Sequence, residues 1–352
     1  MRWLKNGVPV LAANIRDVAA LARVSVGTVS NVLNKSKTVS PATEQRVIDA
    51  IETLGFVRND AARQLRVGQS RTVGMMVLDV SNPFFTDVAR GVEDTLSSHN
   101  RSLLLGNSAE DAQREQTHLD LFEEQRVAGL LITPVGDVTA RLERLRKRGS
   151  PAVLVDRHAT TANFSSVSVD DQRGGFLAAQ HLLEQQRTRL AFVGGSRDIV
   201  QVRQRLEGAR DALETAGRSP IRVLEMATMS AEAGRAAGEQ LVALPAAERP
   251  DAVFAANDLL ALGVLQAFTH HGVRVPDDIA LIGYDDIYFA ASSAIPLSSI
   301  RQPAWEMGRA AADLLLAEIE NGTPAEHQHV VFQPELVIRE SSRRNNAAIF
   351  AE

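Results

Sequence analysis

Residues 14–34 read NIRDVAALARVSVGTVSNVLN, and apolar side chains recur in this stretch at helical spacing. Asn14 is placed to cap a first helix, with Asp17 three residues further on. Residues 23–24 interrupt the apolar pattern, and Ser25 is placed to cap a second short helix. Two short helices joined by a tight turn are typical of a helix-turn-helix.

A third helix is expected to follow, with Ser40 as N-cap, Pro41 in its first turn and Gly55 at its end. The second helix carries small or hydrogen-bonding side chains on its outward positions, which are Ser25, Val26, Gly27, Thr28, Ser30 and Asn31. It lacks the long charged side chains of an ordinary exposed helix. Such a surface can lie close against the floor and the phosphates of a DNA major groove.

Charge is unevenly distributed along the 352 residues, although the net charge is only −5. Residues 1–70 contain 10 Lys and Arg against 5 Asp and Glu, whereas the remaining 28 basic and 38 acidic residues carry −10. A basic head on an acidic body favours nucleic acid as a partner of the head. The absence of cysteine, of an apolar run of about 20 residues and of a signal peptide predicts a cytoplasmic protein.

The head resembles the start of the lactose/galactose repressor (LacI/GalR) family over about fifty residues. The matching segments are Asp17-Val18-Ala19, Val24-Ser25, Thr28-Val29-Ser30, Val32-Leu33-Asn34, Val39-Ser40, Arg46-Val47, Ala50-Ile51, Leu54-Gly55-Phe56 and Ala62-Arg63-Gln64-Leu65-Arg66. Two positions depart from the family pattern, which usually has Gly at position 23 and Pro at position 58, where this chain has Arg23 and Arg58. The turn at Arg23 must therefore accept a side chain.

The resemblance implies how the head meets DNA. Val26, Gly27 and Asn31 stand where the family reads base edges, and phosphate contacts fall to Ser25, Thr28, Ser30 and Asn34. Residues 59–66, with Asn59 and Arg63, would form a hinge helix that folds when two subunits meet on DNA. Leu65 would be the wedge inserted into the minor groove at the operator centre. Since one head reads only a few base pairs, a homodimer on palindromic double-stranded DNA is expected.

From Arg71 onward, strand-like apolar runs alternate with amphipathic helical stretches. Strands are expected at 73–78, 103–105, 129–132, 152–155, 167–169, 190–193, 223–224, 252–254 and 280–282. Helices are expected at 84–99, 174–184, 206–216, 231–244 and 259–271. This βαβ repetition predicts parallel sheets covered by helices on both faces, and its length predicts two lobes with a ligand between them.

Polar and aromatic side chains collect at the expected strand ends: Asn82, Phe84, Phe85, Asp156, Arg157, Arg205, Asn257, Asp285 and Gln302. Carboxylates accept hydrogen bonds from sugar hydroxyls, Arg and Asn donate to them, and aromatic rings stack on sugar C–H surfaces. The layout resembles periplasmic sugar-binding proteins, and these nine residues match positions that hold ribose in the ribose-binding protein. This resemblance implies a pentose or similar aldose as effector, and it fits the purine-sensing branch of the family less well.

The predicted fold class is an α/β sensor of two doubly wound Rossmann-like lobes, periplasmic-binding-protein-like, preceded by an all-α helix-turn-helix DNA-binding head. The expected divisions are a tail at 1–13, the head at 14–58, a hinge helix and linker at 59–70, a sensor at 71–340 and a tail at 341–352. Within the sensor, the N-lobe takes about 71–170 and 301–332, and the C-lobe takes about 171–300 and 333–340.

Other classes of protein fit less well. No GxGxxG, P-loop or GxSxG motif supports an enzyme, and no cofactor or metal is expected. His327 and His329 lack an evident third metal ligand. A transport-type sugar-binding protein would share the body but not the head. An activator, or a regulator co-repressed by a phosphosugar or nucleoside, would share the fold, so these alternatives stay open beside an allosteric repressor.

Overall fold

The computed structural model describes residues 13–33, 39–56, 70–159, 163–322, 324 and 326–343. The chain divides into two compact units, Met1–Gln69 and Ser70–Glu352. Each unit has its own buried core, so each is described by itself. Among the described residues, no helix combines the length and the apolar character needed to cross a lipid bilayer.

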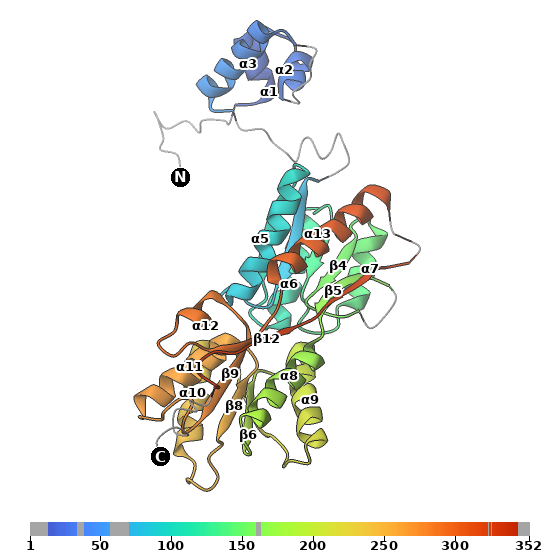
Figure 1. Ribbon diagram of the computed structural model, residues 1–352. Coiled ribbons are helices and arrows are strands. Elements are labelled where there is room, and N and C mark those ends of the chain that lie inside the picture. Colours follow the sequence, from blue (N-terminus) through green and yellow to red (C-terminus); the bar gives the residue numbers. More distant parts are fainter. Residues whose placement is uncertain are drawn as a thin grey trace. The chain divides into compact units, whose positions relative to one another are not determined.

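The first unit contains three helices, α1 (Ile15–Ala22), α2 (Val26–Leu33) and α3 (Pro41–Leu54) (Figure 1). Their apolar faces meet in a small core of Val18, Ala19, Ala22, Val29, Val32, Val47 and Ala50. The predicted cap at the start of α1 is confirmed, because Asn14 Oδ1 accepts from the backbone N of Arg16 at 2.8 Å. The Asn14 backbone N in turn donates to Asp17 Oδ2 at 2.8 Å, which completes a capping box.

Two details of this unit concern backbone conformation. Arg23 ends α1 in the left-handed region, with φ 55° and ψ 49°, so the turn does accept a side chain at the position where the family usually has glycine. Gly55 ends α3 at φ 58°, as its position predicts. Ser40 precedes α3 but does not cap a backbone N–H; its hydroxyl donates to Thr43 Oγ1 at 3.0 Å instead.

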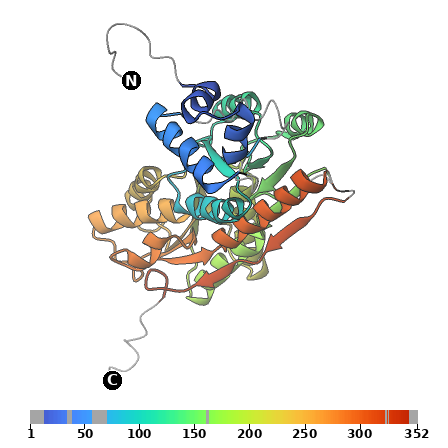
Figure 2. The same ribbon diagram turned by 90° about the horizontal axis from the view of Figure 1, so that it is seen from above.

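The second unit contains two six-stranded sheets, each flanked by helices (Figure 1; Figure 2). The first sheet has the order β11-β5-β4-β3-β1-β2, and all its strand pairs are parallel. Its strands are β1 (Thr72–Val77), β2 (Ser102–Asn107), β3 (Leu130–Ile132), β4 (Ala152–Val155), β5 (Ser165–Val169) and β11 (His329–Phe332). Its helices are α5 (Pro83–Ser98), α6 (Ala112–Glu124), α7 (Thr139–Lys147) and α13 (Ala304–Asn321).

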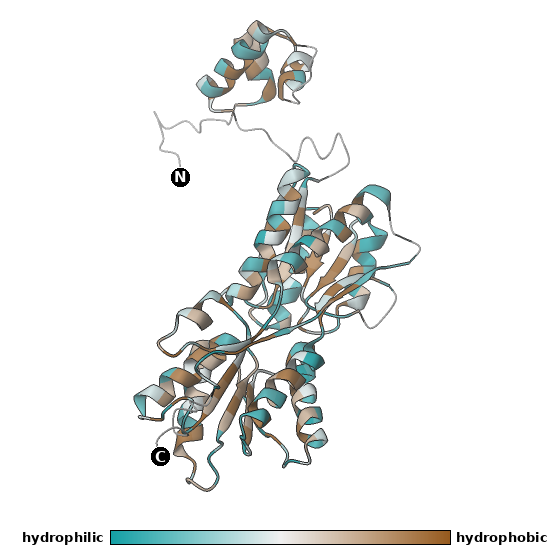
Figure 3. Cartoon of the chain, in the orientation of Figure 1, coloured by the Kyte–Doolittle hydropathy of each residue, from teal (hydrophilic) through white to brown (hydrophobic). Residues whose placement is uncertain are grey.

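The second sheet has the order β12-β10-β9-β8-β6-β7 and is parallel except for the edge pair of β10 and β12. Its strands are β6 (Leu190–Gly194), β7 (Arg222–Glu225), β8 (Ala252–Ala255), β9 (Ala280–Asp285), β10 (Ser298–Arg301) and β12 (Glu335–Val337). Its helices are α8 (Asp171–Glu184), α9 (Val200–Thr215), α10 (Ala231–Ala243), α11 (Asp258–His270) and α12 (Tyr288–Ser292). The central strands are coloured mostly brown in Figure 3, which marks hydrophobic residues, as expected for strands that helices cover on both faces.

The chain passes between the sheets three times, at 169–171, 301–304 and 332–335. We call the part built on the first sheet the N-lobe and the part built on the second the C-lobe. The predicted fold class is confirmed. The helices α6, α7 and α13 are not among those expected from the sequence, and α9 begins six residues before its expected start. No side-chain cap marks this earlier start, because the residue before α9 is Ile199.

Candidate functional site

The first candidate site is the outward face of α2. Ser25, Val26, Gly27 and Asn31 are exposed, whereas Val29 on the same helix is fully buried. Val26 keeps 41% of its surface exposed. The helix therefore presents small and polar groups to solvent and anchors itself through its other side.

Ser25 holds the start of this helix, because its Oγ accepts from the backbone N of Thr28 at 3.0 Å and lies 2.9 Å from Thr28 Oγ1. Thr28 and Ser30 are half-buried at the edges of the exposed face. Four of the expected DNA-contacting residues lie outside the described residues: Asn34, Asn59, Arg63 and Leu65.

The second candidate site is a cavity of about 20 Å³ between the two lobes. Seven of the nine predicted effector residues line it, namely Asn82, Phe84, Phe85, Asp156, Arg205, Asn257 and Asp285. They come from the loops and helix starts that follow β1, β4 and β8, from the last residue of β9, and from α9. The carboxyl ends of parallel strands thus meet here, as expected for a doubly wound fold.

Asp285 lines this cavity and bonds to side chains on two other segments. Its Oδ2 accepts from Asn82 Nδ2 of the N-lobe at 2.8 Å, and its Oδ1 accepts from Gln302 Nε2 at 2.8 Å. Burial raises the pKa of Asp285 to about 6, although Arg205 and the two amide donors oppose this rise. The buried carboxylate of Asp285, at the end of a C-lobe strand, is therefore bonded both to Asn82 of the N-lobe and to Gln302 in the crossover between the lobes.

Arg205 is the buried cation of the cavity. Its Nε donates to Asp171 Oδ1 at 2.7 Å and its Nη1 donates to the Ala256 carbonyl at 2.6 Å. The guanidinium lies 3.6 Å from the ring centroid of Tyr284 and its Nη1 lies 3.8 Å from Asp285 Oδ1. Burial lowers the pKa of Arg205, but the carboxylates of Asp171, Asp285 and Asp156 outweigh it, so the group stays charged.

Asp156 and Arg157 are neighbours in sequence but face different cavities. Asp156 adopts φ 52° and its Oδ2 accepts from Gln201 Nε2 at 3.0 Å inside the lobe cavity. Burial, and next the charge of Asp171, raise the pKa of Asp156 well above its usual value. Arg157 does not line the lobe cavity; it lines a second cavity within the N-lobe.

Asn257 combines a structural bond with its place in the cavity. Its Oδ1 caps α11 by accepting from the backbone N of Leu260 at 2.8 Å, and its Nδ2 donates to the Met229 carbonyl at 3.0 Å. Gln302 lies on the other side of Asp285, where it lines a larger cavity of about 460 Å³. Its Oε1 is buried and has no hydrogen-bond partner in the described part of the chain.

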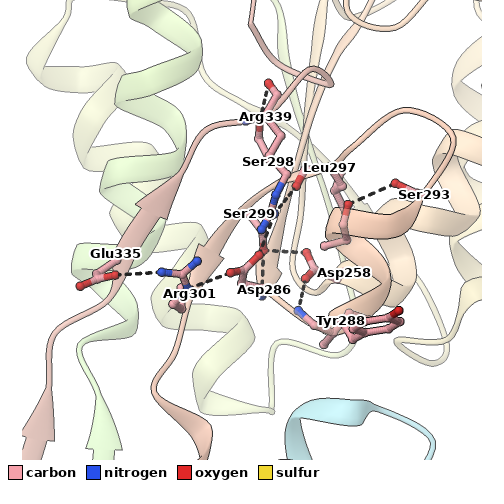
Figure 4. A network of polar contacts seen from close by, with 12 residues as sticks. Asp258, Asp286, Tyr288, Ser293, Leu297, Ser298, Ser299, Arg301, Glu335 and Arg339 are labelled. Atoms are coloured by element: carbon pink, nitrogen blue, oxygen red, sulfur yellow. Dashed lines mark hydrogen bonds and ion pairs between the residues drawn. The ribbon is translucent and has the colours of Figure 1, made fainter.

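Asp286 faces away from the lobe cavity and has a structural role. Its carboxylate forms ion pairs with Arg301 at 2.8 Å and Arg339 at 2.7 Å, and its backbone N donates to Ser299 Oγ at 3.0 Å. Figure 4 shows this network beside Asp258, which accepts from Ser299 Oγ at 2.7 Å. The adjacent carboxylates of Asp285 and Asp286 thus face different surroundings. Asp285 lines the lobe cavity, whereas Asp286 pairs with Arg301 and Arg339, so the two do not form a catalytic pair.

Sequence reasoning missed several residues of the cavity. Gln201 lines the cavity near the start of α9, where no capping residue signals a helix. Asp171 does not line the cavity but pairs with Arg205 from the first turn of α8, a helix that the sequence predicts to begin three residues later. Ile199, Val202 and Met229 add apolar surface to the lining. The Asp170 cap, whose side chain accepts from the backbone N of Arg173, was the available signal for the start of α8.

A small helical head with an exposed polar reading face, followed by a two-lobed sensor with a buried polar cavity, defines a ligand-responsive DNA-binding regulator. Residues 14–59 match the model of bacterial regulatory proteins of the lacI family, and residues 179–342 match that of the periplasmic binding protein-like domain. The chain belongs to the lacI family of transcriptional regulators.

Two curated relatives extend over almost the whole chain. The HTH-type transcriptional repressor PurR of Aliivibrio fischeri (strain MJ11) is 35% identical over 335 residues, which cover 94% of this chain and 98% of the relative. The ribose operon repressor of Escherichia coli (strain K12) is 36% identical over 332 residues, which cover 94% and 100%. Both relatives are repressors and neither is an enzyme.

Two solved structures are similar as well. The lac repressor dimer bound to operator and the anti-inducer ONPF has a TM-score of 0.79 at 26% identity, covering 94% of this chain and 99% of that one. A LacI family transcriptional regulator from Enterococcus faecium with bound ribose has a TM-score of 0.70 at 30% identity, covering 77% of this chain and 98% of that one.

Proposed function

We propose that this repressor binds a palindromic operator as a homodimer and is released by a small sugar, a pentose or a similar aldose, bound between its lobes. The observation that carries the effector proposal is the lobe cavity, where buried carboxylates, amides and one guanidinium stand beside Phe84 and Phe85. Alternating acceptors and donors next to aromatic rings suit a polyhydroxylated ring. The related structure with bound ribose supports the same class of ligand.

Binding of the sugar requires a change of the cavity. A site for a small molecule usually encloses about 300 Å³ or more, whereas this cavity has about 20 Å³. Sugar hydroxyls would replace the hydrogen bond from Asn82 Nδ2 to Asp285 Oδ2, which now joins the two lobes directly. The lobes would then settle at a different separation, and a dimer would transmit that difference to its DNA-binding parts as a population shift.

The proposed DNA contacts follow the exposed face of α2. Val26, Gly27 and Asn31 would read base edges, and Ser25, Thr28 and Ser30 would contact phosphates. The related dimer bound to operator supports this mode of binding. The roles proposed for Asn34, Asn59, Arg63 and Leu65 come from the family resemblance. Because operator DNA lies in the cytoplasm, the proposed operator binding also implies a cytoplasmic protein.

The proposal is tested by operator release. An operator selected from a random DNA pool is labelled, and its dissociation constant is measured by fluorescence anisotropy with and without each sugar of a pentose and hexose panel. One pentose or aldose should weaken operator binding about tenfold or more, the usual size of allosteric coupling. Asp156→Asn should keep operator affinity and lose the response, whereas the exposed Asp198→Asn should respond like the parent. A panel in which no sugar changes operator affinity would refute the effector class.

A further inference from the structure

The N-lobe contains a second cavity, of about 370 Å³, on the other side of the Asp156–Arg157 turn from the lobe cavity. The loop before α7, the end of β4 and Phe164 enclose it. It shares none of its lining residues with the lobe cavity. Its volume lies within the usual range of small-molecule sites, about 300–1,000 Å³.

One wall of this cavity is apolar. Leu142, Leu154 and Phe164 are nearly or fully buried and contribute their side chains to the lining, together with Val138. These side chains belong to the N-lobe core below the cavity. The wall therefore suits the hydrocarbon or ring part of an organic molecule better than it suits a free inorganic ion.

The cavity is also lined by a charged group, the guanidinium of Arg157. Its Nη1 atom is buried and forms no hydrogen bond with the part of the chain described. A half-buried cation without a hydrogen-bonding partner is costly, and such a group is typical of a site that an anion completes. Burial lowers the pKa of Arg157 and the nearby charge of Arg203 lowers it further, whereas the carboxylates of Asp137, Asp156 and Glu115 oppose this lowering.

The acidic side chains around Arg157 are engaged with backbone groups. Asp137, the acidic residue among the lining side chains, accepts from the backbone N of Thr139 at 2.9 Å. Glu115 accepts from the backbone N of Val135 at 2.7 Å. In the described part of the chain no hydrogen bond joins either carboxylate to Arg157 Nη1, so this buried N–H group keeps its donor capacity for a ligand.

We propose that this N-lobe cavity binds a small organic anion, a phosphate monoester or carboxylate, with its charged group on Arg157 and its apolar part against Leu142, Leu154 and Phe164. The site shares no lining residue with the lobe cavity, and its proposal does not rest on the sugar proposed there. It lies at the end of β4, one residue from Asp156, so its ligand would bias the Asp156 turn that faces the effector.

The test uses isothermal titration calorimetry of the full chain with phenyl phosphate, which combines a ring with a phosphate monoester. Inorganic phosphate and benzyl alcohol serve as partial ligands with only the charge or only the ring. Phenyl phosphate should bind at least about tenfold more tightly than either, the gain expected when a charge-assisted hydrogen bond and apolar burial act together.

Three variants locate the site. Arg157→Gln should weaken phenyl phosphate binding about tenfold or more, and Arg157→Lys should retain a large part of the affinity because it keeps the charge. Arg144→Gln, which removes an exposed cation from the same lobe on α7, should bind like the parent. Equal binding by the parent and Arg157→Gln, or inorganic phosphate binding as tightly as phenyl phosphate, would overturn the proposal.

Discussion

Arg23 shows how a single residue can add strain to a DNA-binding head. Its φ of 55° is a left-handed conformation that costs an ordinary residue about 1–2 kcal/mol. Arg23→Gly should therefore stabilise the head by about 1 kcal/mol, after part of the gain is offset by the greater entropy of the unfolded glycine. Amide hydrogen exchange at Val29 in the full chain should slow about fivefold, whereas Arg23→Ala, which keeps the strain, should leave exchange nearly unchanged. A Gly variant no more protected than the Ala variant would contradict this explanation.

Asp285 makes the stability of the sensor depend on pH. Its pKa is near 6 in the folded chain and 3.8 for the unperturbed group, so the folded state binds the proton more tightly. The stability from this group is present below pH 3.8 and is lost as pH rises through 6, an effect of about 3 kcal/mol. Asp285→Asn cannot lose a proton, so the parent should become less stable relative to this variant between pH 4 and 6.5. Chemical denaturation at several pH values measures that difference, and a constant difference would contradict the assignment.

Glycines set the spacing of the helix pair α8 and α9. A Cβ on Gly208 would lie 1.8 Å from the Gln172 carbonyl, and one on Gly175 would lie 2.0 Å from the Arg205 carbonyl. Gly208→Ala should thus destabilise the C-lobe by about 1–3 kcal/mol and displace Arg205 from the cavity. Gly136→Ala is the matched control, because an added Cβ there meets nothing within 4 Å. Thermal unfolding of both variants gives the comparison, and equal melting temperatures would show that the helices can separate without cost.

The sequence predicts the helices and strands that carry a local burial pattern or a capping residue, and it predicts poorly those that depend on contacts distant in sequence. The strands around Val73 and Ala280 and the caps at Asn14 and Gly55 are visible because burial and capping leave local signals. The antiparallel placement of β12 has no such signal, since it depends on contacts with β10 that are distant in sequence. The orientation of Arg157 depends on the φ of Asp156, which residue types alone do not specify.

The proposed function requires that the lobe cavity and the head are coupled through one conformational equilibrium. Thermodynamic linkage makes such a coupling reciprocal: a sugar that weakens operator binding must itself bind more weakly to the operator complex, by the same factor. This relation does not depend on which path through the chain carries the change.

The most direct test is therefore calorimetric titration of the effector sugar into the free protein and into the protein saturated with its selected operator. The dissociation constant of the sugar should be higher for the operator complex by the same factor, about tenfold or more, by which the sugar weakens operator binding. Equal sugar affinity for the free and the operator-bound protein would contradict the proposed coupling between the lobe cavity and the head.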